Sequence, residues 1–283
     1  MNNEFDVIQH ENGNIIEFRD LEQYVKGVSS SYLIKGKSIN ILIDCLSGRF
    51  DLFEKLPQDL PLVILLTHAH VDHIGGLVNF ANKSNIDIYI HQYELEFVLR
   101  GIDMHPEIRK KQIVKFFKNN EDRQPNFIAV PTVKPLQDKT IFQFGKGDKE
   151  YIVAIHTPAH TNGSMCFYTP SFGGCLFTGD TYYYPEKQFS TYGFEKNYKL
   201  QTQHNQIIRL YEEYHDNLQH VFTGHNGDQK DEFFAFVKRK QKRNKISTLE
   251  CCICGIRNVL LYFDEKQTNL IFCGKSCQKI HYQ

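Results

Sequence analysis

Three histidines and one aspartate lie within the short segment 67–76, which reads THAHVDHIGG. Neutral imidazole and carboxylate groups are ligands that zinc and related divalent cations take in proteins. Burying four such groups without a cation would be costly, because each would need a polar partner of its own. The segment therefore predicts a metal site with His68, His70, Asp72 and His73 as ligands.

Three residues further along the chain are candidates for completing a second metal shell, since one short segment cannot surround two cations. His160, Asp180 and His225 each follow a predicted strand and lie near a glycine. Loops at strand ends hold functional side chains on a rigid scaffold. We expect these three residues to converge with the histidine-rich segment.

The elements that must position these residues alternate between strands and helices. The apolar run 62–66 directly precedes the histidine-rich segment, and its lack of polar alternation predicts a strand buried on both faces. The other elements expected in the first half are a hairpin (28–34 with 39–43), a helix (74–83), a strand (86–90) and two helices (92–100 and 107–118).

The second half of the chain is richer in strands. The expected strands are 151–155, 164–168, 175–178 and 219–222, with helices at 200–214 and from about 229 into the basic run 238–245. Sheets covered by helices on their outer faces are the natural class for this order of elements.

The ordered motifs of residues 14–245 resemble those of the metallo-β-lactamase fold superfamily. The resemblance implies an α+β fold, a four-layer αββα sandwich with two divalent metals at the edge between two sheets. It also implies that His68, His70 and His160 bind the first metal, that Asp72, His73 and His225 bind the second, and that Asp180 bridges both. Zinc is the expected metal, with iron and manganese as alternatives.

Two adjacent metals would share a hydroxide, whose formation at neutral pH follows from a lowered water pKa of about 7. Hydrolysis of an ester, thioester, amide or phosphodiester is then expected without a serine or cysteine nucleophile. Asp72 is the residue expected to orient the hydroxide.

Features around the ligands narrow the substrate. A signal peptide and a cysteine in place of Asp180 are typical of true β-lactamases, and both are missing. Too few residues separate Asp180 from His225 for a β-CASP domain. The forms Thr-Gly-Asp180 and Thr-Gly-His225-Asn-Gly resemble the acyl thioester branch, which includes glyoxalase II. The basic set that binds glutathione in glyoxalase II is not found, so the carrier stays open. The segment 182–194 is either an aromatic substrate wall or a packed loop.

Two alternatives remain beside the thioesterase. One is a phosphodiesterase of the ribonuclease Z type, in which the basic run 238–245 and the tail grip RNA. The other is a zinc-finger scaffold with a vestigial metal site. Lys and Arg together number 33, as do Asp and Glu, so the chain has no basic excess of the kind that broad polyanion binding favours.

The last 33 residues hold five of the eight cysteines. Cys251, Cys254, Cys273 and Cys277 have the paired spacing of a structural zinc site, with Cys252 and His281 in reserve. The segment 251–281 resembles the last part of a MYND zinc finger, although the middle cysteine pair is missing. The expected domains are therefore a hydrolase domain, 1–245, and a MYND-like module, 246–283, with one zinc and, as the resemblance implies, a role in binding a protein partner.

The remaining cysteines, the short length of the apolar runs and the first residues predict an ordinary intracellular protein. Cys45, Cys166 and Cys175 lie singly in apolar stretches, as buried cysteines do. No apolar run approaches the roughly 18 residues of a membrane span, and the start MNNEFD lacks the features of a signal peptide. We expect a cytoplasmic location, with nuclear import through 238–245 as the alternative.

Overall fold

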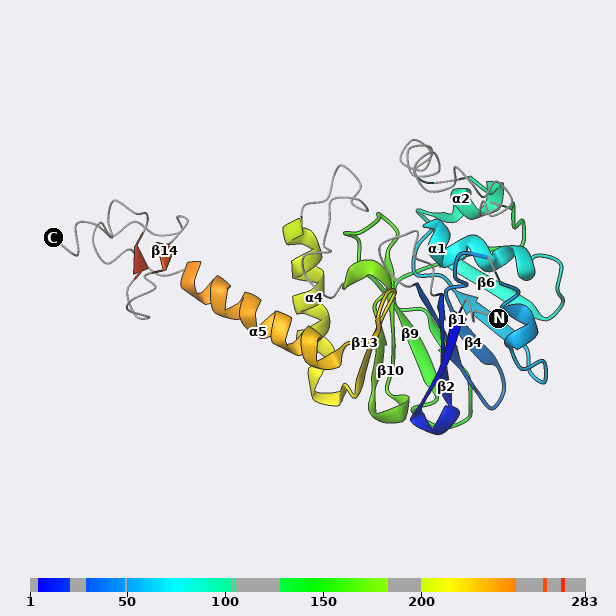
Figure 1. Cartoon of the computed structure of the whole chain (residues 1–283), viewed down its shortest axis with the longest axis horizontal. Coiled ribbons are helices and arrows are strands. Elements are labelled where there is room, and N and C mark those ends of the chain that lie inside the picture. Colours follow the sequence, from blue (N-terminus) through cyan, green and yellow to red (C-terminus); the bar gives the residue numbers. More distant parts are fainter. Residues whose placement is uncertain are drawn as a thin grey trace. The chain divides into compact units, whose positions relative to one another are not determined.

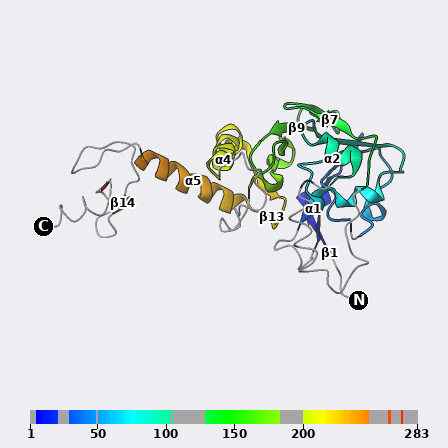
Figure 2. The ribbon, with the colours of Figure 1, turned by 90° about the horizontal axis from the view of Figure 1, so that it is seen from above.

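The computed structural model describes residues 5–20, 29–48, 50–102, 104, 128–182, 200–247, 262–263 and 271–272 (Figure 1, Figure 2). The chain divides into two compact units, Met1–Phe233 and Phe234–Gln283. The domain boundary expected between residues 245 and 246 falls inside the second unit and stays a prediction.

The first sheet is built in chain order. Its strands are β1 (Phe5–His10), β2 (Ile15–Asp20), β3 (Ser30–Ile34), β4 (Asn40–Ile43), β5 (Leu62–Leu65), β6 (Ile86–His91) and β7 (Lys134–Leu136). Strands β1 to β4 pair antiparallel, whereas β4 to β7 pair parallel. The carboxyl ends of β4, β5 and β6 therefore meet at one edge, which is where parallel sheets commonly carry their sites.

The second sheet also follows the chain. Its strands are β8 (Ile141–Gln143), β9 (Tyr151–His156), β10 (Met165–Thr169), β11 (Cys175–Phe177), β12 (His220–Thr223) and β13 (Gly227–Asp228). Only β11 and β12 are parallel, with Phe177 opposite Phe222. The loops that follow these two strands therefore leave the sheet side by side.

Helices and short 3-10 turns connect the strands. The α-helices are α1 (Val71–Ile74), α2 (Leu95–Arg100), α4 (Leu200–Tyr214) and α5 (Lys230–Ser247). The 3-10 helices are Glu11–Gly13, Phe53–Lys55, Gly75–Asn79, Ser171–Gly173, Gly179–Thr181 and His215–Asn217. None of the described helices is long and apolar enough to cross a membrane.

Alternating side chains of the first sheet fill two separate cores. Ile41 and Ile43 join residues of the second sheet, such as Phe167 and Phe222, in the core between the sheets. Leu42 faces the other way, into a core that α1 and α2 cover. On the far side α4 buries Ile207 and Leu210, and its Tyr214 ring packs 4.2 Å from the ring of Tyr168 in β10. The layers are thus helix, sheet, sheet and helix, as the expected sandwich requires (Figure 1).

The helix expected at 74–83 differs from the structure. The helical segment begins at Val71, continues as a 3-10 helix from Gly75 and ends at Asn79. A second backbone packs closely against this segment, because a β-carbon on Gly75 would lie 2.2 Å from the carbonyl oxygen of Ser47 and one on Gly76 would lie 1.8 Å from that of Cys45. Glycine at both positions lets the backbone at Ser47 and Cys45 pass directly against the helix.

Other expected elements match more closely. The helix at 200–214 and the buried strand at 62–66 are present, and the helix expected at 92–100 begins only at Leu95. Strands β1, β2, β7, β8 and β13 were not expected. In the second unit, β14 (Tyr262–Phe263) pairs antiparallel with β15 (Ile271–Phe272). The four tail cysteines and the helix expected at 107–118 lie outside the described residues.

Candidate metal centre

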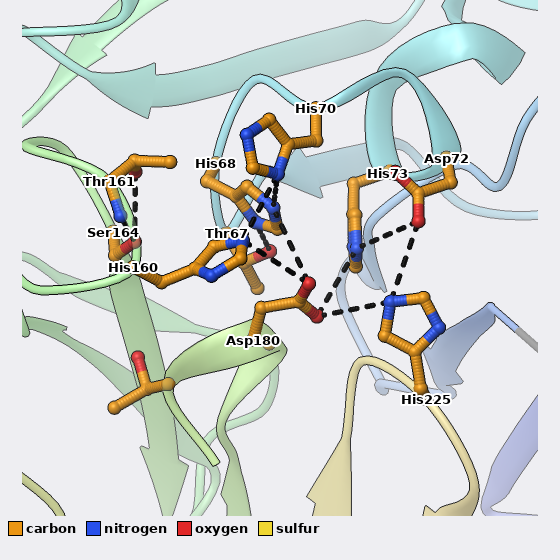
Figure 3. Close-up of polar contacts among 12 residues, drawn as sticks. Thr67, His68, His70, Asp72, His73, His160, Thr161, Ser164, Asp180 and His225 are labelled. Atoms are coloured by element: carbon orange, nitrogen blue, oxygen red, sulfur yellow. Dashed lines mark hydrogen bonds and ion pairs between the residues drawn. The ribbon is translucent and has the colours of Figure 1, made fainter. Parts of the chain in front are cut away.

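All seven predicted ligands come together where the two sheets meet (Figure 3). The loop after β5 and the helix α1 that follows it bring two each, and the segments after β9, β11 and β12 bring one each. The donor atoms form two groups, in each of which they lie within 4.8 Å of one another: His68, His70, His160 and Asp180 in the first, and Asp72, His73 and His225 in the second.

The first donor set has the spacing of a tetrahedral metal shell. His70 Nδ1 lies 2.9 Å from His68 Nε2 and 3.0 Å from His160 Nε2. Asp180 Oδ2 lies 3.3 Å from His160 Nε2 and 3.8 Å from His68 Nε2. Ligands at about 2.0 Å from a tetrahedral zinc ion are about 3.3 Å apart, which is the middle of this range.

The second donor set has the same spacing. Asp180 Oδ1 lies 3.3 Å from His73 Nε2 and 3.4 Å from His225 Nε2. Asp72 Oδ2 lies 3.7 Å and 3.4 Å from the same two nitrogens. The two oxygens of Asp180 therefore face different donor sets, as a bridging carboxylate would.

Two neighbours fix the position of Asp180, whose side chain is 3% exposed. A β-carbon on Gly224 would lie 2.3 Å from Asp180 Oδ1 and 2.9 Å from His73 Cε1, so only glycine fits there. From α4, the buried Gln203 donates through Nε2 to the carbonyl oxygens of Asp180 and Thr181, each at 2.9 Å. Gln203 was not predicted, because nothing in a single helical glutamine marks it.

Asp44, also missed from the sequence, orients ligands of both sets. Its Oδ2 accepts hydrogen bonds of 2.8 Å from His73 Nδ1 and from the hydroxyl of Thr67, and its Oδ1 accepts one of 2.8 Å from the Thr67 amide. The same hydroxyl oxygen lies 3.0 Å from His68 Nδ1 and accepts a hydrogen bond from it. Both rings thus carry their proton on Nδ1 and aim Nε2 at the donor sets. The position of Asp44 directly after strand β4 is the feature of the sequence that could have identified this residue.

The charges of the site divide between the two sets. Burial lowers the pKa of His160 to about 4 and that of His68 well below its usual range, so both rings are neutral at pH 7. Burial would also lower the pKa of His73 and His225, but Asp180 and the other nearby carboxylates raise it. Burial opposes ionisation of Asp180, yet the surrounding histidines hold its pKa well below its usual value. The carboxylates of Asp72 and Asp180 therefore favour positive charge, from a proton or a cation, at the second set.

These features suit divalent cations. His73 Nε2 is buried and makes no hydrogen bond, although two carboxylate oxygens lie within 3.7 Å of it. A buried imidazole nitrogen whose partner nitrogen is held by a carboxylate is the usual arrangement of a metal-binding histidine. Imidazole and carboxylate donors in this number fit zinc, iron or manganese.

The aromatic segment expected to wall the substrate is described only at Tyr182. That side chain is 1% exposed and its ring packs edge-on against Phe233, 5.1 Å between centroids. Tyr182 is therefore part of the packed interior, and the rest of the segment up to residue 194 lies outside the described residues.

Comparison with known proteins agrees with the geometry. Acyl-coenzyme A thioesterase MBLAC2 of Gallus gallus is 28% identical over 173 residues, which cover 54% of this chain and 57% of that protein. The probable metallo-hydrolase YybB of Bacillus subtilis is 30% identical over 122 residues, which cover 43% of this chain and 46% of that protein. The chain thus spans about half the length of the curated relatives it matches.

Solved structures show the same fold. A metallo-β-lactamase from Pontibacter korlensis superposes with a TM-score of 0.57 at 18% identity, covering 84% of this chain and 99% of that one. A superfamily protein of the archaeon Sulfolobus tokodaii gives a TM-score of 0.52 at 18% identity over 75% of this chain and 80% of that one. A family model matches residues 24–245. The chain belongs to the metallo-β-lactamase superfamily.

Proposed function

We propose that the chain is a dinuclear metal-dependent hydrolase that acts on an acyl thioester. The observation that carries the proposal is the pair of donor sets joined by the two oxygens of Asp180. Divalent cations held there would polarise a carbonyl group and supply a nucleophile at neutral pH by lowering the pKa of water.

The chain's own residues divide the work of the reaction. Within the two donor sets, His70 and Asp72 are partly exposed and the other five residues are buried. The substrate therefore approaches from the side of His70 and Asp72. The Asp72 carboxylate is 17% exposed, against 3% for that of Asp180. We assign to Asp72 the orientation of the attacking water and to Asp180 the joining of the two sets.

The described cysteines support a reaction without a thiol nucleophile. Burial raises the pKa of Cys166 to about 11 and that of Cys45 well above its usual value. Thiols with such pKa values carry almost no thiolate at pH 7, which is the reactive form.

The proposed substrate class is supported by the activity that one relative is named for. The matched protein of Gallus gallus is an acyl-coenzyme A thioesterase, and the match covers about half of it. A thioester carbonyl is a suitable target for this site because its thiolate leaving group departs without needing a strong acid. We therefore favour the thioester over the phosphodiester.

A parallel hydrolysis assay tests the proposal. Purified wild type, Asp72→Asn and the control Asp59→Asn, a change at an exposed aspartate, would be given acyl-coenzyme A, acyl-glutathione and a chromogenic phosphodiester. We expect thioester turnover by wild type and the control, and a fall of about 100-fold or more in Asp72→Asn, the size of effect that general acid–base groups have. Turnover of the phosphodiester alone would contradict the thioester and favour the ribonuclease-like alternative.

For the tail we propose one structural zinc held by Cys251, Cys254, Cys273 and Cys277. Four thiolates close a tetrahedron and leave no position for catalysis. Metal analysis of Cys273→Ser with Cys277→Ser should show one zinc less per chain than wild type, with hydrolysis retained. An unchanged zinc content would contradict this site.

A further inference from the structure

Glu94 is a buried carboxylate that the proposed reaction does not use. It lies in the turn between β6 and α2, directly before the first helical residue, and is 0% exposed. Charged side chains are almost never fully buried unless they are paired or hydrogen-bonded. Its position therefore calls for a function, either in the fold or in the site.

The carboxylate joins two loops that are far apart in the sequence. Its Oε2 accepts a hydrogen bond of 2.5 Å from the amide of Ala69. Its Oε1 accepts one of 2.9 Å from the amide of Gly163 and another from the hydroxyl of Thr161. One loop follows β5 and the other follows β9, so Glu94 links the first sheet to the second.

The bonded residues are adjacent to ligands of the first donor set only. Ala69 stands between His68 and His70, and Thr161 directly follows His160. All three histidines of the first set thus lie within one residue of a group that Glu94 holds.

The same turn holds the second loop in two further ways. A β-carbon on Gly163 would lie 2.7 Å from Glu94 Cγ, so the loop packs directly against the side chain. The His91 ring stacks on the His156 ring at 4.0 Å, with 10° between their planes. His156 Nε2 in turn lies 2.9 Å from the carbonyl oxygen of Asn162, to which it donates.

We propose that Glu94 is a positioning residue that sets the geometry of the His68, His70 and His160 donors, so that its loss weakens one metal site and spares the other. The proposal rests on the dinuclear site proposed above and adds a residue outside both donor sets. Glu94 acts through the backbone amides of Ala69 and Gly163 and the hydroxyl of Thr161.

Glutamine is the informative replacement because it keeps the size of the side chain. An amide nitrogen in the place of Oε2 would face the N–H of Ala69, and one in the place of Oε1 would face the N–H of Gly163. Either rotamer sets a donor against a donor in a buried place, which shifts one loop away from the other. Outer partners of metal ligands typically contribute 10- to 100-fold to metal affinity.

The test measures zinc release from the zinc-loaded full chain by a chromophoric chelator. Glu94→Gln would be combined with His225→Ala, which leaves only the first set intact, and with His160→Ala, which leaves only the second. We expect Glu94→Gln to weaken the remaining site zinc by about 10- to 100-fold in the first combination and not in the second. The tail zinc cancels because every comparison is between variants that share the tail.

Glu96→Gln is the matched control, since Glu96 lies on α2, is mostly exposed and pairs with Arg100. It should change neither site. Thr161→Val, which removes a single hydroxyl bond to Glu94, should give a smaller weakening of the first site and answers the question if Glu94→Gln does not fold.

Equal zinc affinity of Glu94→Gln and its parent in the His225→Ala background would overturn the role of Glu94 and leave the proposed function intact. Equal weakening in both backgrounds would also overturn it, because a general loss of structure does not select one site. Wild type that holds no site zinc would instead contradict the dinuclear hydrolase itself, and the role of Glu94 would fall with it.

Discussion

Replacing Asp44 with asparagine would exchange one oxygen for an NH2 group behind both donor sets. The backbone should tolerate the change, because Asp44 has φ of 58° and asparagine is among the few residues that adopt the left-handed region readily. The side chain is buried, at 2% exposure, and all three hydrogen bonds it accepts measure 2.8 Å. The effect of the substitution therefore comes from the hydrogen bonds and from the loss of the Asp44 charge beside His73.

Asparagine can satisfy those bonds in neither of its orientations. With its nitrogen towards His73, the His73 ring must move its proton to Nε2, the atom that faces Asp72 and Asp180. With its nitrogen in the place of Oδ1, the buried backbone N–H of Thr67 loses its acceptor, at a cost of about 1–3 kcal/mol. The first outcome should weaken zinc at the second donor set, and the second should weaken it at the first, whose His68 directly follows Thr67. The expected size is about 10- to 100-fold, which corresponds to about 1.4–2.8 kcal/mol.

Chelator competition on the zinc-loaded protein would measure the affinity, and 15N NMR of the imidazoles would report the His73 tautomer. Asp59→Asn serves again as the exposed control. We expect hydrolysis to fall together with zinc occupancy and to recover in part at high zinc. Wild-type zinc affinity in Asp44→Asn, with the His73 proton still on Nδ1, would refute the argument that this carboxylate sets the tautomer.

Three further predictions follow from the described contacts. The buried Glu17 accepts hydrogen bonds from Arg19 and Ser30, and its pKa is lowered because these partners and His10 outweigh the effect of burial. A carboxyl group whose pKa is lower in the folded state than in the unfolded state stabilises the fold above its unfolded pKa, and this stabilisation is lost in acid. Glu17→Gln should therefore lower the free energy of unfolding, measured in urea, by about 2 kcal/mol at pH 7 and by less near pH 3. An equal loss at both pH values would contradict this. Iodoacetamide should modify Cys45 and Cys166 only after unfolding, because burial raises their pKa values, and peptide mapping of the native protein checks it. Chelation of zinc should lower Tm. Bound zinc should stabilise the fold by up to about 4 kcal/mol at a free zinc concentration about 1,000 times Kd, and a Tm that does not depend on zinc would contradict metal binding by the fold.

The histidine-rich segment could be predicted because its information is local. Four donors at fixed short spacing follow a strand that is recognisable from its unbroken apolar run, and the structure places that strand between two parallel neighbours. His160, Asp180 and His225 required only the rule that strand ends meet at a sheet edge. The structure brings all seven donors together, and their binding of metal stays a prediction.

The residues that support the donors could not be predicted in this way. Asp44 contacts a residue 23 positions away and Glu94 contacts one 69 positions away, so no local pattern links either to its partner. Strands β7 and β8 have three residues each, too few to show a period, and depend on neighbouring strands for their pairing. The close approach of the Ser47 backbone to Gly75 likewise has no local signal in the sequence.

Each sheet is built from one uninterrupted half of the chain, β1 to β7 from residues 5–136 and β8 to β13 from residues 141–228. The first half carries four of the seven donors and the second half carries three. Neither half alone completes either donor set, so both sets form only once the halves have docked. A bound cation would then link the two halves at their interface and slow their separation. Fragments cut between β7 and β8 should reassemble more firmly with zinc than without it.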